Sequence, residues 1–305
     1  MLSVGDRGTV TASAHTPGAP LRLVQISDTH LSRWDGPLRR NFTKLANYVN
    51  EVLRPDLIVH TGDVILSNPD ADADYRAAVE LLGQLSAPVR YLPGNHDVGE
   101  AYDDTWWGTT SERLARFRKY FGETPWLEWF GGVGLIGLDS QLLGNGLPEE
   151  HEQWRRLEDL AETVGTKSVM FFQHTSFWTG AMGSDGRPGC LAERDRERLL
   201  DIFGQARLLG TGNGDVHRYR KVWHDTAFEL WGPSTAFLVH REEAAKLPAG
   251  LEQLGVVLYE FEHENVAATF QTTPGLEEVE VGAFPESRRV REEIRAAIRD
   301  FEAAV

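Results

Sequence analysis

Aspartate, histidine and asparagine residues gather in five short clusters along this 305-residue sequence. Carboxylate, imidazole and amide side chains of this kind are the groups with which proteins bind divalent metal ions. Each cluster alone is weak evidence, because a Gly-Asp pair is usually a turn. The five together, in this order, predict a metal site. The clusters are Asp28-Thr29-His30, Gly62-Asp63, Gly94-Asn95-His96-Asp97, His174 and Gly214-Asp215-Val216-His217.

Each cluster follows a short apolar run that is typical of a buried strand. In layered α/β proteins, the loops beyond the carboxyl ends of the strands form the ligand-binding crevice. Strands of one sheet would therefore bring the clusters together, although the first and last lie far apart in the sequence. The runs cover residues 21–26, 56–60, 89–92, 168–172 and 206–209.

Helix-like segments alternate with these strands, which is the pattern of a layered α/β fold. The predicted helices cover residues 39–53, 72–85, 111–121, 148–164 and 193–203, and a further strand covers residues 134–138. After residue 217 the pattern changes to strands alone, which predicts a second sheet packed on the first. These later strands cover residues 219–223, 227–231, 236–239, 255–262 and 267–271.

We expect three segments along the chain. Residues 1–20, rich in Gly, Ala, Ser, Thr and Pro, are interpreted as a tail, residues 21–282 as one domain, and residues 283–305 as a C-terminal helix. Val290, Ile294 and Phe301 fall on one face of that helix. We expect this face to pack on its own domain. The alternative is that it joins two copies of the chain into a homo-oligomer.

The composition disfavours several classes of protein. The net charge of −15 disfavours binding to long nucleic acids, because an acidic surface repels phosphate backbones. The single cysteine, Cys190, allows neither an intrachain disulfide nor a cysteine-based zinc site. No apolar run reaches membrane-spanning length, and the first 20 residues lack the apolar core of a signal peptide. We therefore expect a cytoplasmic protein that does not bind a membrane.

The series D-x-H, G-D, G-N-H-D, H and G-x-x-H resembles the pattern of the calcineurin-like metallophosphoesterase superfamily over residues 21–271. The Gly94-Asn95-His96-Asp97 block is its most specific part. The spacing looks closest to the bacterial branch that includes cyclic-nucleotide phosphodiesterases. The resemblance implies an α/β fold, a four-layer α/β/β/α sandwich of two mixed sheets, with a two-metal centre at one end.

The resemblance also implies a role for each matching residue. His96 would be the general acid that protonates the leaving oxygen, and Asp97 would orient the imidazole of His96. Two divalent ions would clamp the phosphate and lower the pKa of a bound water, so that hydroxide attacks phosphorus in line. The implied ligands are Asp28, His30 and His217 for the first ion, Asp63 for both ions, and Asn95 and His174 for the second.

The last cluster departs from the family pattern, which is Gly-His-x-His. Asp215 stands where the family has a histidine that binds the second metal. Asp215 would bind in its place, which favours Mn²⁺ or Mg²⁺ over Zn²⁺ because a carboxylate is a harder ligand. The alternatives are a weak second site and a degenerate site. We expect two divalent ions from among Mn, Fe, Zn and Mg, with Mn favoured.

The expected reaction is hydrolysis of a small phosphodiester, with a 3′,5′-cyclic nucleotide as the narrower expectation by analogy. The alternatives are a phosphomonoesterase, a nucleotide pyrophosphatase, or a pseudoenzyme that binds without turnover. Trp34 and Trp178 are candidates to stack on a base, and Arg218 is a candidate to neutralise phosphate. Alternatively, both rings pack loops on the core and Arg218 forms an ion pair within the fold. Residues 175–192, which follow His174, are predicted to form a loop over the site.

Overall fold

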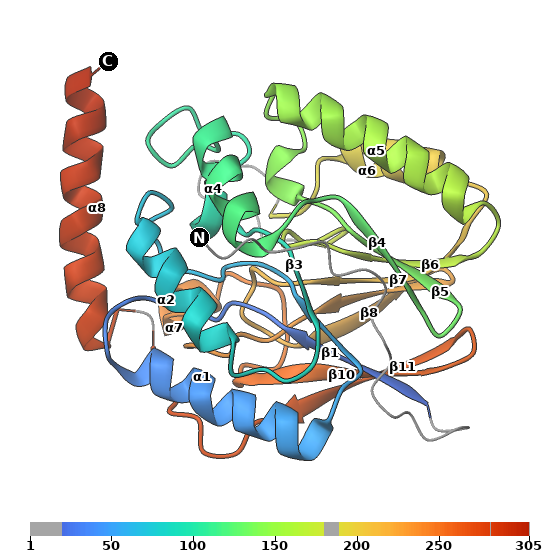
Figure 1. Ribbon diagram of the computed structural model, residues 1–305, viewed down its shortest axis with the longest axis horizontal. Coiled ribbons are helices and arrows are strands. Elements are labelled where there is room, and N and C mark those ends of the chain that lie inside the picture. Colours follow the sequence, from blue (N-terminus) through green and yellow to red (C-terminus); the bar gives the residue numbers. More distant parts are fainter. Residues whose placement is uncertain (1–19, 180–188, 281, 305) are drawn as a thin grey trace, which may run out of the picture.

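The computed structural model describes residues 20–179, 189–280 and 282–304. Two β-sheets face each other, with helices on the outer side of each (Figure 1). This arrangement confirms the predicted sandwich of two mixed sheets. The predicted tail lies outside the described residues except for its last residue, and so does much of the predicted loop over the site.

The first sheet has the strand order β11-β10-β1-β2-β3. Strand β1 pairs in parallel with β2, and on its other side it pairs antiparallel with β10. Leu23, for example, lies beside Leu57 on one side and Tyr259 on the other. The strands are β1 (Leu21–Ile26), β2 (Leu57–His60), β3 (Val89–Tyr91), β10 (Gly255–Glu262) and β11 (Asn265–Thr272).

The second sheet has the strand order β4-β5-β6-β7-β9-β8. Strands β5, β6, β7 and β9 run parallel to one another, and β4 and β8 are antiparallel strands at the two edges. The strands are β4 (Trp126–Phe130), β5 (Val133–Gly137), β6 (Ser168–Phe172), β7 (Arg207–Asn213), β8 (Arg220–His224) and β9 (Ala227–Trp231).

The prediction that the strands after residue 217 form a sheet of their own is wrong. Strands β8 and β9 extend the sheet that contains β7, whereas β10 and β11 join the sheet that contains β1. The predicted strand at residues 236–239 is a loop in which Leu238 makes an isolated bridge to Glu280. Hydrophobic pattern identifies a strand but does not name its neighbour, because pairing depends on contacts remote in sequence.

The helices lie close to their predicted positions. The first begins at Pro37, whose fixed φ suits the first turn of a helix, and passes into a turn of π-helix at Val49–Leu53. Short helical turns cover Ser140–Leu142 and Arg241–Ala244 (α7). The first helix is α1 (Pro37–Tyr48). The remaining helices are α2 (Asp72–Leu82), α3 (Asn95–Val98), α4 (Ser111–Phe121), α5 (Pro148–Val164), α6 (Glu193–Ile202) and α8 (Pro285–Ala304).

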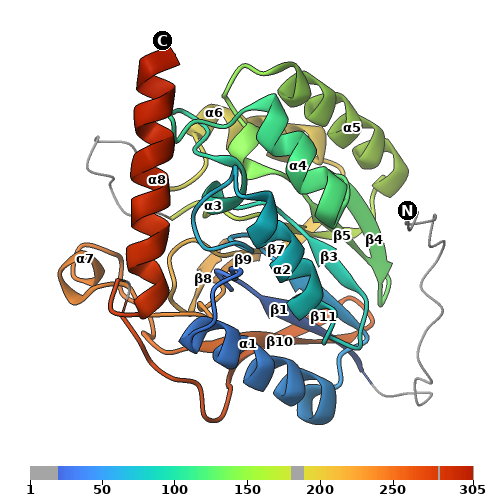
Figure 2. The same ribbon diagram turned by 60° about the vertical axis from the view of Figure 1, so that its left-hand side comes forward.

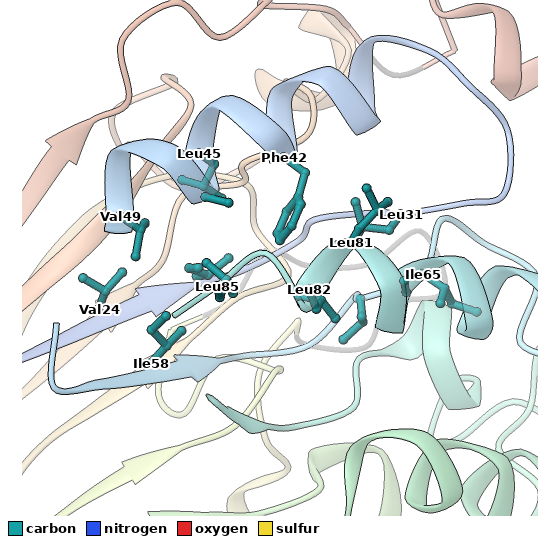
Figure 3. Close-up of a cluster of buried hydrophobic side chains, with 14 of the residues drawn as sticks. Val24, Leu31, Phe42, Leu45, Val49, Ile58, Ile65, Leu81, Leu82 and Leu85 are labelled. Atoms are coloured by element: carbon teal, nitrogen blue, oxygen red, sulfur yellow. The ribbon is translucent and has the colours of Figure 1, made fainter. Parts of the chain in front are cut away.

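Apolar side chains fill the space between the layers. Figure 3 shows Leu45 and Val49 of the first helix directed towards Val24 and Ile58 of the first sheet, and Phe42 further along the same helix. Burying such a side chain stabilises the fold by about 1.5–3 kcal/mol. A second cluster fills the space between the sheets, and a third lies between the second sheet and helices α5 and α6. These layers fix the strand ends that carry the five clusters.

Helix α8 runs along one side of the molecule, with its N-terminal end beside α1 (Figures 1 and 2). Val290 and Ile294 are buried in a fourth cluster, and Phe301 near the far end is 39% exposed. The helix therefore packs on its own domain over its first half. A homo-oligomer formed through α8 stays a prediction. Among the described residues, no helix is both long enough and apolar enough to cross a membrane.

Gln25 of β1 links the two sheets just below the strand ends. Its Nε2 donates to Thr61 Oγ1 at 3.0 Å and to the carbonyl of Asn213, in β7, at 2.9 Å. Its Oε1 accepts the hydroxyl proton of Tyr259 at 2.7 Å. All four residues are buried or nearly so, so these hydrogen bonds have no competition from bulk water.

We expect Gln25→Ala to lower the free energy of unfolding by about 2–4 kcal/mol, because each buried group that loses its partner costs about 1–3 kcal/mol. Urea denaturation of the metal-free protein in EDTA measures this change. The matched control is Gln84→Ala at an exposed position, for which we expect a change within about 0.5 kcal/mol. Equal stability of the two variants would contradict the bridging role of Gln25.

Candidate metal centre

Four of the predicted ligands meet in one buried group. The metal-binding atoms of Asp28, His30, Asp63 and His217 all lie within 4.8 Å of one another. They come from the loops that follow β1, β2 and β7, so strands of both sheets deliver them to the same end of the sandwich. Carboxylate and imidazole together suit Mn²⁺, Fe²⁺ or Zn²⁺.

Two histidines of this group present the same ring nitrogen to each other. His30 Nδ1 lies 3.2 Å from the carbonyl of Leu66, and His217 Nδ1 lies 3.1 Å from the carbonyl of Phe237. A carbonyl only accepts, so both Nδ1 atoms carry the proton and both Nε2 atoms carry a lone pair. The two Nε2 atoms are 3.2 Å apart. Two facing lone pairs cannot hydrogen-bond, but they can share a cation.

Asp28 supports the same conclusion. Its Oδ1 lies 3.2 Å from His217 Nε2, and its Oδ2 is buried without a hydrogen-bond partner. A buried carboxylate oxygen without a partner is costly. A metal ion would satisfy it together with the two imidazole lone pairs. The residues present therefore fit a divalent cation.

A second set of ligand atoms surrounds His174. Its Nδ1 donates to the carbonyl of Thr61 at 2.7 Å, and its Nε2 faces Asn95 Oδ1 at 3.1 Å. A cation bound at Nε2 would displace any proton there and use its lone pair. Asn95 presents this oxygen because its Nδ2 donates to Glu100 Oε1 at 2.7 Å. Acceptor atoms thus converge here as well. This second set also fits a cation.

Asp63 lies between the two sets. Its Oδ2 is 3.6 Å from His30 Nε2, and its Oδ1 is 3.4 Å from His174 Nε2. Its Oδ1 also accepts the backbone N–H of His96 at 2.9 Å, which fixes the carboxylate. The structure therefore places Asp63 where a bridging ligand would stand.

The electrostatics of the group are those of closely packed, buried charges. Burial lowers the pKa of His174, but Asp63, Asp28 and Asp215 outweigh this effect and raise it to about 10. Burial and the neighbouring carboxylates of Asp28 and Asp97 hold the pKa of Asp63 well above its usual range. The raised pKa favours the protonated form of Asp63. A cation beside Asp63 would lower this pKa, because it favours the ionised carboxylate.

Five of the candidate ligands have left-handed backbone conformations. The φ angles are 52° at Asp28, 44° at His30, 54° at Asp63, 71° at Asp215 and 55° at His217. Non-glycine residues seldom adopt this region, and such strain is concentrated at functional sites. The backbone turns sharply at each strand end, which directs the side chains towards one point.

Asp215, the departure from the family pattern, also lies at the site. Its backbone N–H donates to Asp28 Oδ1 at 3.2 Å, and its own Oδ1 is 3.7 Å from His174 Nε2. Its side chain is 36% exposed, whereas that of His174 is buried. Asp215 therefore stands at the solvent side of the second set. That it binds metal stays a prediction.

His96 lies beside both sets of ligand atoms. Its Nδ1 lies 2.8 Å from the carbonyl of Leu66 and 3.0 Å from Ser67 Oγ, and its Nε2 lies 3.8 Å from Asp63 Oδ2. Its side chain is 31% exposed. Of the four candidate histidines, His96 thus has the most exposed side chain.

The prediction that Asp97 orients the imidazole of His96 is wrong. Leu66 and Ser67 hold that ring, and the carboxylate of Asp97 accepts three backbone N–H groups instead. The donors are Val64 at 3.1 Å, Ile65 at 2.9 Å and Gly94 at 2.9 Å. Asp97 thereby joins the loop that carries Asp63 to the loop that carries Asn95. The Gly94–Asp97 motif alone could not show that Asp97 accepts hydrogen bonds from backbone N–H groups rather than from the imidazole of His96.

Arg218, one of the three predicted substrate contacts, serves the fold instead. Arg218 is buried, where it donates to the carbonyls of Ala244 and Pro248 and pairs with Glu252. This is the alternative ion pair considered from the sequence.

Both tryptophans pack against neighbouring side chains. The guanidinium groups of Arg33 and Arg289 lie 4.5 and 4.8 Å from the centre of the Trp34 ring. The ring of Trp178 stacks on His224 at 4.6 Å, and the backbone N–H of Trp178 donates to Glu229 Oε1 at 2.8 Å. Both rings therefore have packing partners, as the alternative considered from the sequence expects. That either ring stacks on a base stays a prediction.

Sequence reasoning missed the groups that orient the ligands. The carbonyls of Leu66, Thr61 and Phe237 fix all four candidate histidine rings, and Glu100 fixes Asn95. No residue type marks a backbone carbonyl that performs this task. Glu100 alone had a signal, since it is an acidic residue just after the Gly94–Asp97 block.

Comparison with known proteins places these residues in context. The model of the calcineurin-like phosphoesterase family matches residues 21–209, which include four of the five clusters. A probable glycerophosphodiester phosphodiesterase of Arcobacter nitrofigilis is 27% identical over 78% of this chain and 91% of its own length. The 3′,5′-cyclic adenosine monophosphate phosphodiesterase of Escherichia coli is 31% identical over 47% of this chain and 52% of its own.

Solved structures agree on the fold. A dimetal phosphatase from Danio rerio superimposes with a TM-score of 0.57, over 84% of this chain and 97% of that one. Its sequence identity to this chain is only 13%. At that identity the likeness shows the arrangement of layers and strands and nothing about the substrate.

Asp97→Asn tests the role of that carboxylate. We expect it to weaken Mn²⁺ binding about 10-fold, as loss of a supporting group around a metal site commonly does. The free energy of unfolding should fall by about 1.5–3 kcal/mol, because an amide cannot accept all three N–H groups. Mn²⁺ titration followed by electron paramagnetic resonance, with urea denaturation, measures both. The exposed Asp104→Asn is the control. Loss of turnover alone, with binding and stability kept, would restore the orienting role.

Proposed function

The chain belongs to the calcineurin-like phosphoesterase family, and from that premise we propose that it hydrolyses a small phosphodiester with two divalent metal ions. The observation that carries the proposal is the position of Asp63 between two sets of ligand atoms, 3.6 Å from His30 Nε2 and 3.4 Å from His174 Nε2. A carboxylate between two such sets is the arrangement that a two-metal phosphoesterase requires.

The chain's own residues would hold two ions. Asp28, His30 and His217 form one half of the site, and Asn95 and His174 the other, with Asp215 beside the second half. Because the donors are oxygen and nitrogen atoms without a thiolate, Mn²⁺ is the favoured ion. When bound, such ions neutralise phosphate oxygens and lower the pKa of the attacking water.

His96 supplies the proton for the leaving oxygen in this proposal. Its Nδ1 is held by Leu66 and Ser67, which directs Nε2 towards the Asp63 side of the site. Burial lowers the pKa of His96 to about 4. A bound phosphate anion would raise it again, because a nearby negative charge favours the protonated ring.

The relatives support a diester substrate. The two relatives named above carry the names of phosphodiesterases, a probable glycerophosphodiester phosphodiesterase and a 3′,5′-cyclic adenosine monophosphate phosphodiesterase. A 3′,5′-cyclic nucleotide is the narrower substrate that we propose. A glycerophosphodiester is the second candidate, because that relative matches 78% of the chain rather than 47%.

The first test is metal content and activity on one sample purified without chelator. We expect about two metal ions per chain and a higher kcat/KM for bis(p-nitrophenyl) phosphate than for p-nitrophenyl phosphate in Mn²⁺. The variant Asp63→Asn should lose both metal and activity, and Asp104→Asn should keep both. Cyclic AMP and glycerophosphoethanolamine then separate the two substrates.

Two outcomes of this test would contradict the proposal. Faster hydrolysis of the monoester would favour a phosphomonoesterase. Absence of turnover with every divalent ion would favour a protein that binds its ligand without hydrolysis.

The variant His96→Ala tests the role of the acid. We expect kcat to fall about 10²–10⁴-fold for a diester with an alkyl leaving group, which must be protonated as it departs. Bis(p-nitrophenyl) phosphate should be affected much less, because p-nitrophenolate leaves without a proton. Steady-state kinetics on both substrates measures the difference. Equal losses on the two would remove His96 from this role.

A further inference from the structure

We propose that Phe237 and Phe284 are positioning residues that hold the metal-binding histidines in place, and that α8 thereby contributes to metal affinity. This inference rests on the metal site of the proposed function. The starting point is the ring of Phe237, whose centroid lies 4.6 Å from that of His30 and 4.9 Å from that of His217. One apolar ring thus contacts both histidines whose Nε2 atoms face each other.

Phe237 acts on His217 in two ways. Its carbonyl accepts the Nδ1 proton of His217 at 3.1 Å, and its ring packs on the same imidazole. The hydrogen bond fixes one edge of the imidazole, while the ring contact limits how far the imidazole can swing. His30 is confined similarly, between Phe237 and the perpendicular ring of His96 at 4.8 Å.

The loop that carries Phe237 is itself fastened to the strand end of Asp28. Ser234 Oγ donates to the Asp28 carbonyl at 3.0 Å, and the N–H of Thr235 donates to the Ser27 carbonyl at 3.3 Å. Ser234 and Thr235 are buried, so water does not compete for these bonds. The loop and the first metal ligand therefore hold a fixed relation to each other.

Phe284 packs against Phe237. The two rings stack at 5.5 Å with an angle of 29° between their planes, and both are buried. Phe284 directly precedes α8, whose Val290 and Ile294 belong to the same apolar cluster. Packing contacts thus connect α8 to Phe284, Phe284 to Phe237, and Phe237 to the imidazoles of the two histidines.

A second connection ties α8 to the loop after Asp28. The guanidinium of Arg33 pairs with Glu293 of α8 and lies 3.0 Å from Asp74 of α2. Arg33 follows shortly after His30 in the sequence. The Arg33–Glu293 ion pair and the Phe284 contact are therefore two separate connections between α8 and the segments that hold His30 and His217. Groups that orient metal ligands commonly change metal affinity about 10–100-fold when they are removed.

The test measures Mn²⁺ affinity in the full-length protein. We expect Phe284→Ala to weaken Mn²⁺ binding about 10-fold, since Phe237 then borders a cavity and its ring no longer fixes the histidines. The matched control is Phe203→Ala, which removes an equally buried ring from the cluster under α6, away from the histidines. Its Mn²⁺ affinity should equal that of the wild type, although both variants lower the unfolding midpoint of the metal-free protein.

Phe284→Leu provides the second variant should the alanine protein fail to fold. It keeps most of the buried volume but removes the stacked ring, so we expect a smaller loss of Mn²⁺ affinity. Electron paramagnetic resonance of free Mn²⁺ gives the dissociation constants, and circular dichroism verifies the fold. Unchanged affinity in the folded Phe284 variants, or an equal loss in Phe203→Ala, would overturn the inference.

Failure of the proposed function is distinguishable from failure of this inference. A wild-type protein that binds Mn²⁺ but hydrolyses no phosphodiester would refute the proposed function, and the affinity comparison would still decide the role of Phe284. A wild-type protein that binds no Mn²⁺ would overturn both, because there would be no affinity for α8 to support.

Discussion

The two buried carboxylates of Asp28 and Asp63 set the constraint on which the rest of this structure depends. A carboxylate removed from water needs opposite charge or hydrogen bonds in compensation. Here the backbone N–H of Asp215 supplies part of that compensation for the first, and the backbone N–H of His96 for the second. A metal ion bound beside His217 and His174 would supply the rest. These partners stand on loops of both sheets, so the compensation exists only once the sheets have packed together.

Backbone groups, more than side chains, then decide which atoms face the centre. Carbonyl oxygens take the Nδ1 protons of the imidazoles, which leaves every Nε2 directed inward. The left-handed backbone conformations of five candidate ligands after the strands direct their side chains towards the centre. Asp97 adds the same kind of support from a side chain, by binding the N–H groups of Val64, Ile65 and Gly94. The centre is therefore held by loop conformations that only specific strand positions permit.

These facts explain how far the sequence could predict the molecule. Apolar runs followed by Asp28, Asp63 and His174 located the strand ends correctly, because burial and chain direction are local properties. The pairing of β1 with β10 was beyond reach, since an antiparallel neighbour more than 200 residues away leaves no local pattern. The position of Arg218 could not be predicted for a related reason. Its partners lie at the end of α7 and in the loop after it, and the sequence does not mark these residues as neighbours of Arg218. The sequence thus predicts the candidate ligands better than it predicts the groups that hold those ligands in place.

The position of β1 between β2 and β10 also bears on how the chain is made. A nascent polypeptide that has reached the end of β7 already contains Asp28, Asp63 and His174, yet β10, at Gly255–Glu262, has not been synthesised. One side of a central strand then has no partner, and such long-range pairing is slow to form. The first sheet therefore cannot be complete until β10 and β11 have been translated, and every candidate ligand precedes these two strands in the chain.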